Sequence, residues 1–189
     1  MNKIGTHNSL SYLKPQWWLR LTGLGLMAKC QEVPVEQQYK LGARFFDIRI
    51  RFRKNKVVAA HGMATFKDVD LNSIFTFFNR KKDVTVRIVL ENHMFSKDKT
   101  KDDAKFRDLV YGMVKKYKNV TFTSGIRKRP WTIIVTLPDK VDLRDCYEHF
   151  EGNQIKLPRP KYWAKKKNKE YWSQVDDTAY SLFDFINIK

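Results

Sequence analysis

Four positions in the first half of this 189-residue chain carry side chains suited to acid–base or anion chemistry: His7, Arg49, His61 and Glu91. Imidazole titrates near neutral pH, so two histidines can present one neutral and one protonated ring together. A guanidinium binds two oxygens of one anion through its planar fork. Because a lone histidine is more often a solvated or hydrogen-bonded bystander, the surrounding pattern must decide the interpretation.

Segments with strand patterns precede or contain all four positions, at residues 3–5, 45–52, 56–60 and 84–90. Period-two alternation places Asp47, Arg49 and Arg51 on one face of the second segment. The same alternation places Arg87 and Glu91 on one face of the fourth. Asp47 either takes part in the chemistry or only pins a loop or pairs with Arg49. Both a functional and a structural role stay open for Glu91.

Helical patterns alternate with these strands. The expected helices are 32–41, with Pro34 at its first position and Gly42 as its C-terminal cap, 71–78 and 102–117. Further strands are expected at 131–137 and 181–188, and a loop at 158–169, where prolines interrupt a basic stretch. The alternation indicates an α/β fold with a mainly parallel sheet, whose chemistry lies at the C-terminal ends of the strands. The polar residues singled out above lie at those ends.

The composition is that of a globular and strongly basic protein. Hydrophobic residues make up 42% and charged residues 30% of the chain, which excludes a disordered polymer. There are 37 Lys and Arg against 20 Asp and Glu, for a formal net charge of +17. This excess attracts nucleic acid, an anionic membrane or a phosphorylated substrate, or it serves solubility alone. Composition does not choose among these partners.

Length, hydropathy and cysteines limit the organisation. With no linker or repeat, we expect one domain over residues 1–189, acting as a monomer. No apolar run approaches 18 residues, so no transmembrane helix is expected. The early position of His7 leaves no room for a signal peptide, so the compartment is the cytoplasm or is reached by a signal outside this sequence.

Cys30 and Cys146 lack metal-ligand spacing and are interpreted as reduced thiols, with a disulfide as the alternative.

Three motifs, taken in order and spacing, carry a resemblance to a known family. They are Gly5-Thr6-His7-Asn8-Ser9, Leu41-Gly42-Ala43-Arg44-Phe45-Phe46-Asp47-Ile48-Arg49 and His61-Gly62. The set resembles the catalytic X-domain of phosphatidylinositol-specific phospholipase C, in a compact form similar to the bacterial members. Leu90-Glu91-Asn92-His93 also resembles the strand end that supplies an acidic metal ligand in eukaryotic members. The resemblance covers roughly residues 3 to 93.

The resemblance implies a TIM-type (β/α) barrel. A full barrel usually needs about 200 residues or more. We therefore expect a compact barrel that is irregular or incomplete in its second half. The reduction is placed between Leu137 and Ser181, where little regular structure is expected.

The resemblance also implies a reaction. The inositol 2-hydroxyl of phosphatidylinositol attacks phosphorus and diacylglycerol leaves, which gives inositol 1,2-cyclic phosphate. By family position His7 is the general base, His61 is the general acid and Arg49 stabilises the phosphorane. Asp47 is assigned to the same catalytic set. By family analogy the group that orients His7 comes from the last strand, where Asp184 stands.

Two departures from the family pattern bear on metal dependence. Metal-independent bacterial members usually carry Asp after the first histidine, where it orients the acid, but this chain has Asn8. Calcium-dependent members carry Asn there and a Glu like Glu91, together with an acidic residue where this chain has Arg49. Because a guanidinium repels a cation, we expect catalysis without a metal or other cofactor. The alternative is Ca²⁺ bound by Asn8, Asp47 and Glu91.

Further residues are assigned to contacts with lipid. Substrate binding is assigned to Asn8, Arg87, Glu91 and Trp163. The last of these lies in a basic and aromatic stretch that could equally be a solvated loop. Trp17 and Trp18 are assigned to membrane contact, since amphipathic rings favour headgroup depth, with burial of one ring in the core as the alternative. The implied partners are a phosphatidylinositol-type phospholipid and an anionic membrane surface.

Three other functions are kept open. A nucleic-acid-binding module would explain the charge, but no nucleic-acid-binding motif occurs, so nucleic acid is not an expected partner. A catalytically inactive binder of anionic lipid on the same fold would have no need of His7 and His61. A metal-dependent enzyme related to glycerophosphodiesterase or sphingomyelinase D would need acidic ligands clustered where Arg49 stands.

Overall fold

The structure is a computed structural model, and it describes residues 3–53, 56–91, 97–129, 132–135, 143–145 and 160–188. The strands are β1 (Ile4–Thr6), β2 (Phe45–Arg53), β3 (Lys56–His61), β4 (Ala64–Asp68), β5 (Val84–Leu90), β6 (Val120–Arg129), β7 (Thr132–Val135), β8 (Leu143–Asp145) and β9 (Tyr180–Phe183). The helices are α1 (Trp17–Leu21), α2 (Leu24–Met27), α3 (Val35–Lys40), α4 (Leu71–Asn79), α5 (Lys99–Lys116) and α6 (Pro160–Trp172).

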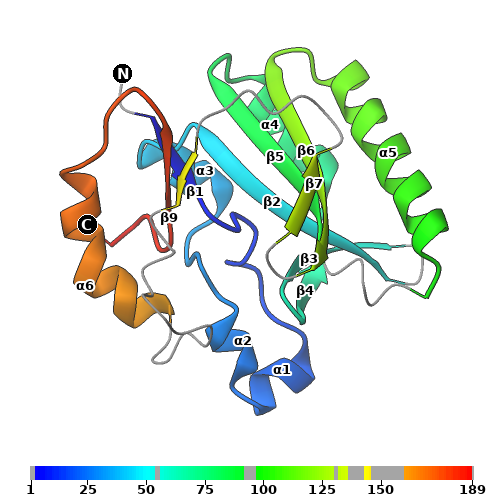
Figure 1. The fold of residues 1–189 in the computed structure, drawn as a ribbon, viewed down its shortest axis with the longest axis horizontal. Coiled ribbons are helices and arrows are strands. Elements are labelled where there is room, and N and C mark those ends of the chain that lie inside the picture. Colours follow the sequence, from blue (N-terminus) through cyan, green and yellow to red (C-terminus); the bar gives the residue numbers. More distant parts are fainter. Residues whose placement is uncertain are drawn as a thin grey trace.

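The strands join the two ends of the chain in one curled sheet (Figure 1). The order is β7-β6-β5-β2-β1-β9-β8, and β3 and β4 branch from β2. Strand β1 pairs in parallel with both β2 and β9, so that Gly5 lies opposite Phe45 and Leu182. Within the described ranges, β7 and β8 end the order and do not pair with each other. The expected compact, incomplete TIM-type barrel is confirmed, and the opening falls in the second half of the chain.

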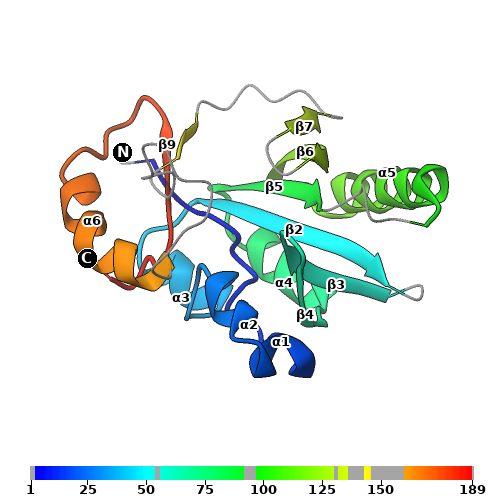
Figure 2. The ribbon, with the colours of Figure 1, turned by 60° about the horizontal axis from the view of Figure 1, so that its bottom comes forward.

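The two faces of the central strands differ sharply in polarity. Phe46, Ile48 and Ile50 of β2 are fully buried in the apolar core, where the ring of Phe46 lies 4.5 Å from that of Phe78 in α4. Figure 2 shows α3 and α4 on this side of the sheet. Residues of opposite parity, such as Asp47, project from the other face. The apolar face therefore attaches the helices, and the opposite face is left for polar side chains.

The strand that carries His61 differs from the expectation. Strand β3 runs antiparallel to β2, with Ala59 opposite Ile50, and so it is not a parallel strand ending at the site. Because β2 continues to Arg53 before the chain reverses, β3 runs back along it (Figure 2). If the pairing continues in this register beyond Ala59, His61 lies opposite Ile48. The residue thus reaches the expected end of the sheet by an antiparallel return.

The loop expected at 158–169 is wrong, because α6 begins at Pro160. Proline is well tolerated in the first turn of a helix, where its missing N–H has no partner to lose. Ala164 and Asn168, four residues apart, are both buried. The Asn168 amide donates to the carbonyls of Asp184 and Ile188 at 2.9 and 2.8 Å, and so attaches α6 to the chain that leaves β9. With α6 and β8 present, the expected lack of regular structure between Leu137 and Ser181 is also wrong.

Other boundaries differ by smaller amounts. The last strand ends at Phe183, not at residue 188, because Phe185 has a positive φ of 49° and donates its N–H to the Cys30 carbonyl. Pro34 caps α3 instead of standing inside it, while Gly42 follows the helix with φ 109° as expected. Strands β4, β6 and β8 are not among the strands that the sequence pattern predicts. Of the strand expected at 131–137, residues 131, 136 and 137 lie outside the described ranges.

Across the described ranges, none of the helices combines the length and the apolar character that a bilayer crossing requires.

We predict that Gly5→Ala destabilises the fold, because β1 passes between two strands with no room for a methyl group. An added Cβ would stand 2.5 Å from Leu182 Cδ2 and 3.0 Å from Phe45 Cβ. Overpacking of this kind costs about 1–3 kcal/mol, measurable by urea unfolding. The matched control is Gly112→Ala in α5, where nothing lies within 4 Å, and it should stabilise the chain by about 0.8–1 kcal/mol. Parental stability of Gly5→Ala would contradict this packing.

Candidate active site

Two histidine rings meet at the C-terminal ends of the first strands. Their centroids lie 5.2 Å apart and their planes are nearly perpendicular, at 83°. His7 is buried, and its Nδ1 lies 2.7 Å from Asp184 Oδ1. His61 is half-buried, and its Nδ1 lies 2.8 Å from the Ala28 carbonyl oxygen. Carboxylates and carbonyls accept hydrogen bonds, so Nδ1 of each ring carries the proton and Nε2 is the nitrogen suited to proton exchange.

The position of His7 follows from the tight turn after β1. Asn8 adopts a left-handed φ of 44°, and the Ser9 N–H donates to the Asp47 carbonyl at 2.8 Å. The buried amide of Gln31 donates to the carbonyls of His7 and Phe183, at 3.1 and 2.8 Å. Gln31 therefore connects the turn after β1 to the end of β9, directly beside Asp184. This link fixes the distance between the histidine and its carboxylate.

The position of His61 follows from a turn that requires glycine. Gly62 has a φ of 55°, a conformation that L-residues with a side chain rarely adopt. Its N–H donates to Glu91 Oε1 at 3.0 Å, and its carbonyl accepts from Arg51 Nη2 at 3.3 Å. Glu91 follows the end of β5 and is 1% exposed. It therefore holds the turn that presents His61.

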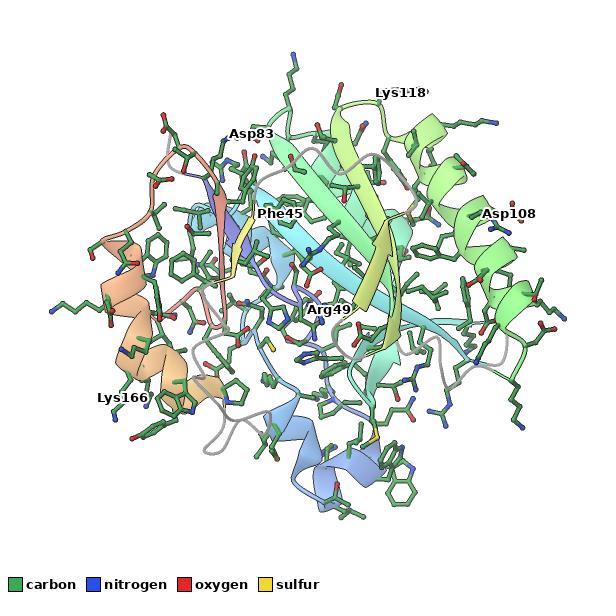
Figure 3. The ribbon with its side chains drawn as sticks, viewed as in Figure 1. Phe45, Arg49, Asp83, Asp108, Lys118 and Lys166 are labelled. Carbon is green, nitrogen blue, oxygen red and sulfur yellow. The ribbon has the colours of Figure 1, made fainter. Side chains whose placement is uncertain are left out.

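A buried carboxylate organises the charged face of the sheet. Asp47 accepts from Arg49 Nε at 2.8 Å, from Arg87 Nε at 2.9 Å and from the Asn8 backbone N–H at 3.2 Å. Arg49 Nη1 also lies 3.7 Å from Glu91 Oε2. Burial by itself raises the pKa of Asp47, but the charges and hydrogen bonds of Arg49 and Arg87 outweigh it and hold the pKa well below its ordinary value. Figure 3 shows Arg49 in the middle of the molecule.

The structure thus brings together most residues that the sequence singled out, although not all. Asn8 lies at the site, and its buried Oδ1 and Nδ2 find no hydrogen-bond partner among the described residues. Trp163 lies on α6, where it contacts Tyr162 and the Lys166 ammonium, and these contacts do not connect it to the histidines. Asn92 and His93 lie outside the described ranges.

The two tryptophans assigned to membrane contact lie on α1. Trp17 is 71% and Trp18 39% exposed, while Leu19, between Trp18 and Arg20, is buried and attaches the helix. Burial of either tryptophan in the core, the alternative interpretation, is therefore wrong. Leu21 on the same helix is 77% exposed. The helix presents an apolar surface next to basic residues.

Sequence reasoning missed three residues that shape the site: Ala28, Cys30 and Gln31. Cys30 carries a buried thiol whose Sγ lies 3.5 Å from His61 Nδ1. All three belong to the irregular segment between α2 and α3, which has no periodicity and no recognised motif. Cys146 lies outside the described ranges.

This arrangement of two anchored histidines beside a buried Arg–Asp pair at the strand ends agrees with a family comparison. The family model described as "Phosphatidylinositol-specific phospholipase C, X domain" matches residues 1–121. The chain belongs to this family. No curated protein sequence matches it.

Solved structures of two bacterial phospholipases share the fold. The phosphatidylinositol-specific phospholipase C of Listeria monocytogenes is 16% identical, with 97% of this chain and 88% of that chain covered and a TM-score of 0.64. A Staphylococcus aureus counterpart, from work on modulation of its membrane binding, is 15% identical, with 97% and 86% covered and a TM-score of 0.62. At these identities the two structures support the fold alone.

We predict that Asp47→Asn destabilises the chain by about 3–5 kcal/mol near neutral pH, because it leaves buried guanidinium groups without their counter-charge. The folded-state pKa lies below the ordinary value of 3.8, so the contribution of Asp47 is present above about pH 4 and is lost as the pH falls toward the folded-state pKa. Urea unfolding near pH 7 and near pH 3 should show a smaller difference from the parent at the lower pH.

The control for this prediction is Asp83→Asn. Asp83 pairs with Arg44 at the surface, where an ion pair contributes about 1 kcal/mol or less. If Asp83→Asn destabilised the chain as much as Asp47→Asn does, the burial of Asp47 would not explain the loss of stability.

Proposed function

We propose that this protein is a phosphodiesterase that cleaves phosphatidylinositol, or a related inositol phospholipid, without a metal. In this reaction the inositol 2-hydroxyl attacks phosphorus, His7 accepts its proton, and His61 donates a proton to the departing diacylglycerol oxygen. The products are inositol 1,2-cyclic phosphate and diacylglycerol. Membership of the phospholipase C X-domain family supports the substrate class.

The observation that carries the proposal is the pair of histidines with differently anchored Nδ1 atoms. An attacking and a departing oxygen on one phosphorus need a base and an acid within a few ångströms of each other. The rings of His7 and His61, 5.2 Å apart, satisfy this requirement. The negative Asp184 stabilises a protonated His7, whereas the neutral Ala28 carbonyl only orients His61. This asymmetry suits His7 to gain a proton and His61 to lose one.

Arg49 is the group proposed to stabilise the pentavalent phosphorus. Its Nε is bound by Asp47 and its Nη1 lies near Glu91, so the guanidinium plane is fixed before substrate binds. The Ca²⁺ alternative would place a cation between Asn8, Asp47 and Glu91. Since the guanidinium already lies between these two carboxylates, it supplies the positive charge that a cation would bring. Arg87 shares Asp47 with it and is proposed to assist substrate binding together with Asn8 and Glu91.

We further propose that residues 1–189 form one catalytic domain that works at an anionic membrane surface. The pairing of β1 with β9 supports a single domain, because it unites the two ends of the chain. The exposed Trp17, Trp18 and Leu21 on α1 support membrane contact, with the net charge of +17 attracting anionic lipid.

The decisive experiment measures the products from phosphatidylinositol vesicles. Release of inositol 1,2-cyclic phosphate and diacylglycerol supports the proposal. Release of inositol phosphate with no cyclic form at any time would point to direct attack by water. No turnover, with vesicle binding intact, would favour the inactive lipid binder.

We predict that His7→Ala and His61→Ala each lower the rate by at least about 100-fold, as expected for a general base and a general acid. The rate of the parent should pass through a bell-shaped maximum with pH. Far-UV circular dichroism of the variants should match the parent. Near-parental turnover in either variant would remove that ring from the mechanism.

We predict that EDTA leaves turnover within about twofold of its original value, whereas Arg49→Ala loses at least about 100-fold, the range seen when one donor to a developing charge is removed. Arg44→Ala is the matched control, because Arg44 pairs with the surface residue Asp83 away from the histidines. Strict dependence on Ca²⁺ would instead favour the site formed by Asn8, Asp47 and Glu91.

We predict that replacing both Trp17 and Trp18 with Ala weakens binding to anionic vesicles but spares hydrolysis of a soluble short-chain substrate. The charge-driven share of binding should fall with salt, because the Debye length is only about 8 Å at physiological ionic strength, and the tryptophan share should persist. Tyr111→Ala is the control, since Tyr111 is 53% exposed on α5. Equal loss on the soluble substrate would show that α1 supports the active site itself.

A further inference from the structure

Cys30 is a nucleophilic group at the site that the proposed mechanism does not use. It lies against both histidines: one potential ligand atom from each of His7, Cys30 and His61 lies within 4.8 Å of the other two. We propose that these three side chains form a binding site for a thiophilic divalent cation of the zinc type. Its occupancy would switch the proposed phosphodiesterase off.

The geometry requires only small side-chain movements. Zinc binds imidazole nitrogen at about 2.0–2.1 Å and thiolate sulfur at about 2.3 Å, which separates tetrahedral ligand atoms by about 3.3–3.6 Å. Cys30 Sγ already lies 3.5 Å from His61 Nδ1. This nitrogen would bind the ion in place of its hydrogen bond to the Ala28 carbonyl, and its proton would move to Nε2. The remaining separations are at most 4.8 Å, so a contraction of at most about 1.5 Å brings them into this range, and water completes the fourth position. His61 is half-buried, which gives an ion an approach from solvent past that ring.

The surroundings of His7 match those of a metal ligand. Its Nδ1–H donates to Asp184 at 2.7 Å, the carboxylate–histidine arrangement that orients Nε2 toward a metal and raises its basicity. When the ion binds, the Cys30 thiol releases its proton to solvent and the thiolate offsets one of the two positive charges. The nearby Arg49 is already compensated by Asp47 and Glu91, which reduces its repulsion of a cation.

The ligand types determine which ions fit. One thiolate and two imidazoles suit zinc and cobalt, whereas Ca²⁺ and Mg²⁺ prefer oxygen ligands. A bound ion would occupy His7 Nε2, so His7 could not accept the proton of the attacking hydroxyl. This inhibition rests on the proposed function, but the binding of the ion does not.

Binding is tested on the full chain without any lipid. The protein is reduced with a non-chelating phosphine and titrated with Co²⁺, whose thiolate charge-transfer absorption reports a cobalt–sulfur bond. We expect a band that saturates at one equivalent, that Zn²⁺ removes by displacement and that Ca²⁺ leaves unchanged. Cys30→Ala and the near-isosteric Cys30→Ser should lose the band. In both, Zn²⁺ should bind more than about 100-fold more weakly, beyond the 10- to 100-fold typical for an outer partner of the metal.

Two further variants distinguish this site from a cobalt ion bound by the second cysteine or elsewhere on the chain. Cys146→Ala should keep the band and the affinity, because Cys146 is not one of the proposed ligands. Asp184→Asn should keep the band and weaken Zn²⁺ about 10- to 100-fold. Far-UV circular dichroism of each variant establishes that it is folded. A parent without the band, a band that survives Cys30→Ala, or one lost in Cys146→Ala would overturn the site.

The switch is tested by turnover of phosphatidylinositol vesicles, with each variant's metal-free rate as its own reference. Zn²⁺ should inhibit the parent at the concentrations that displace cobalt, and should inhibit Cys30→Ala only at concentrations more than about 100-fold higher. Binding without inhibition, or equal inhibition of both proteins, would overturn the switch. If vesicles are not hydrolysed at all, the proposed function fails while the cobalt titration still decides the site.

Discussion

The buried carboxylate of Asp47 is the interaction around which the polar half of the fold is arranged. It faces Arg87 as its direct register partner across β2 and β5, contacts Arg49 on its own strand and accepts the Asn8 N–H from the turn after β1. A carboxylate removed from water is tolerated only when charges and donors replace its hydration. Three segments must therefore meet in one register. The turn that carries His7 is positioned as a consequence.

The same requirement explains the division of the sheet into two faces. Charged side chains that satisfy one another occupy one face, so the opposite face of β2 and β5 can be wholly apolar and can bind α4. Period-two geometry permits this division because adjacent residues point to opposite sides. The apolar core therefore lies between this face of the sheet and the helices packed on it, and the other face is left for polar side chains.

The two histidines lie on strands of different direction, and one binds a carboxylate whereas the other binds a main-chain carbonyl. His7 comes from the first strand and meets Asp184 from the last, a contact between residues 177 positions apart. His61 arrives on an antiparallel return and meets a main-chain carbonyl in the segment between α2 and α3. That segment also supplies Gln31 and Cys30. One irregular stretch therefore anchors both rings and adds a thiol to the proposed acid–base pair.

The sequence by itself determined the local features: the alternation in β2, the apolar faces of α4 and α5, the glycines at Gly42 and Gly62, and the histidine and arginine motifs. These are short-range properties, because they follow from backbone periodicity and from conformations that few residue types adopt. Tertiary structure alone decided that β3 returns antiparallel, that α6 is helical, and that Ala28, Cys30 and Gln31 lie at the site. Helix α6 has little amphipathic pattern, and it is attached by long-range contacts, such as those of Asn168 with carbonyls beyond β9 and of Trp172 with Phe183. Contacts between residues far apart in the chain leave no period in the sequence, so only the folded arrangement reveals them.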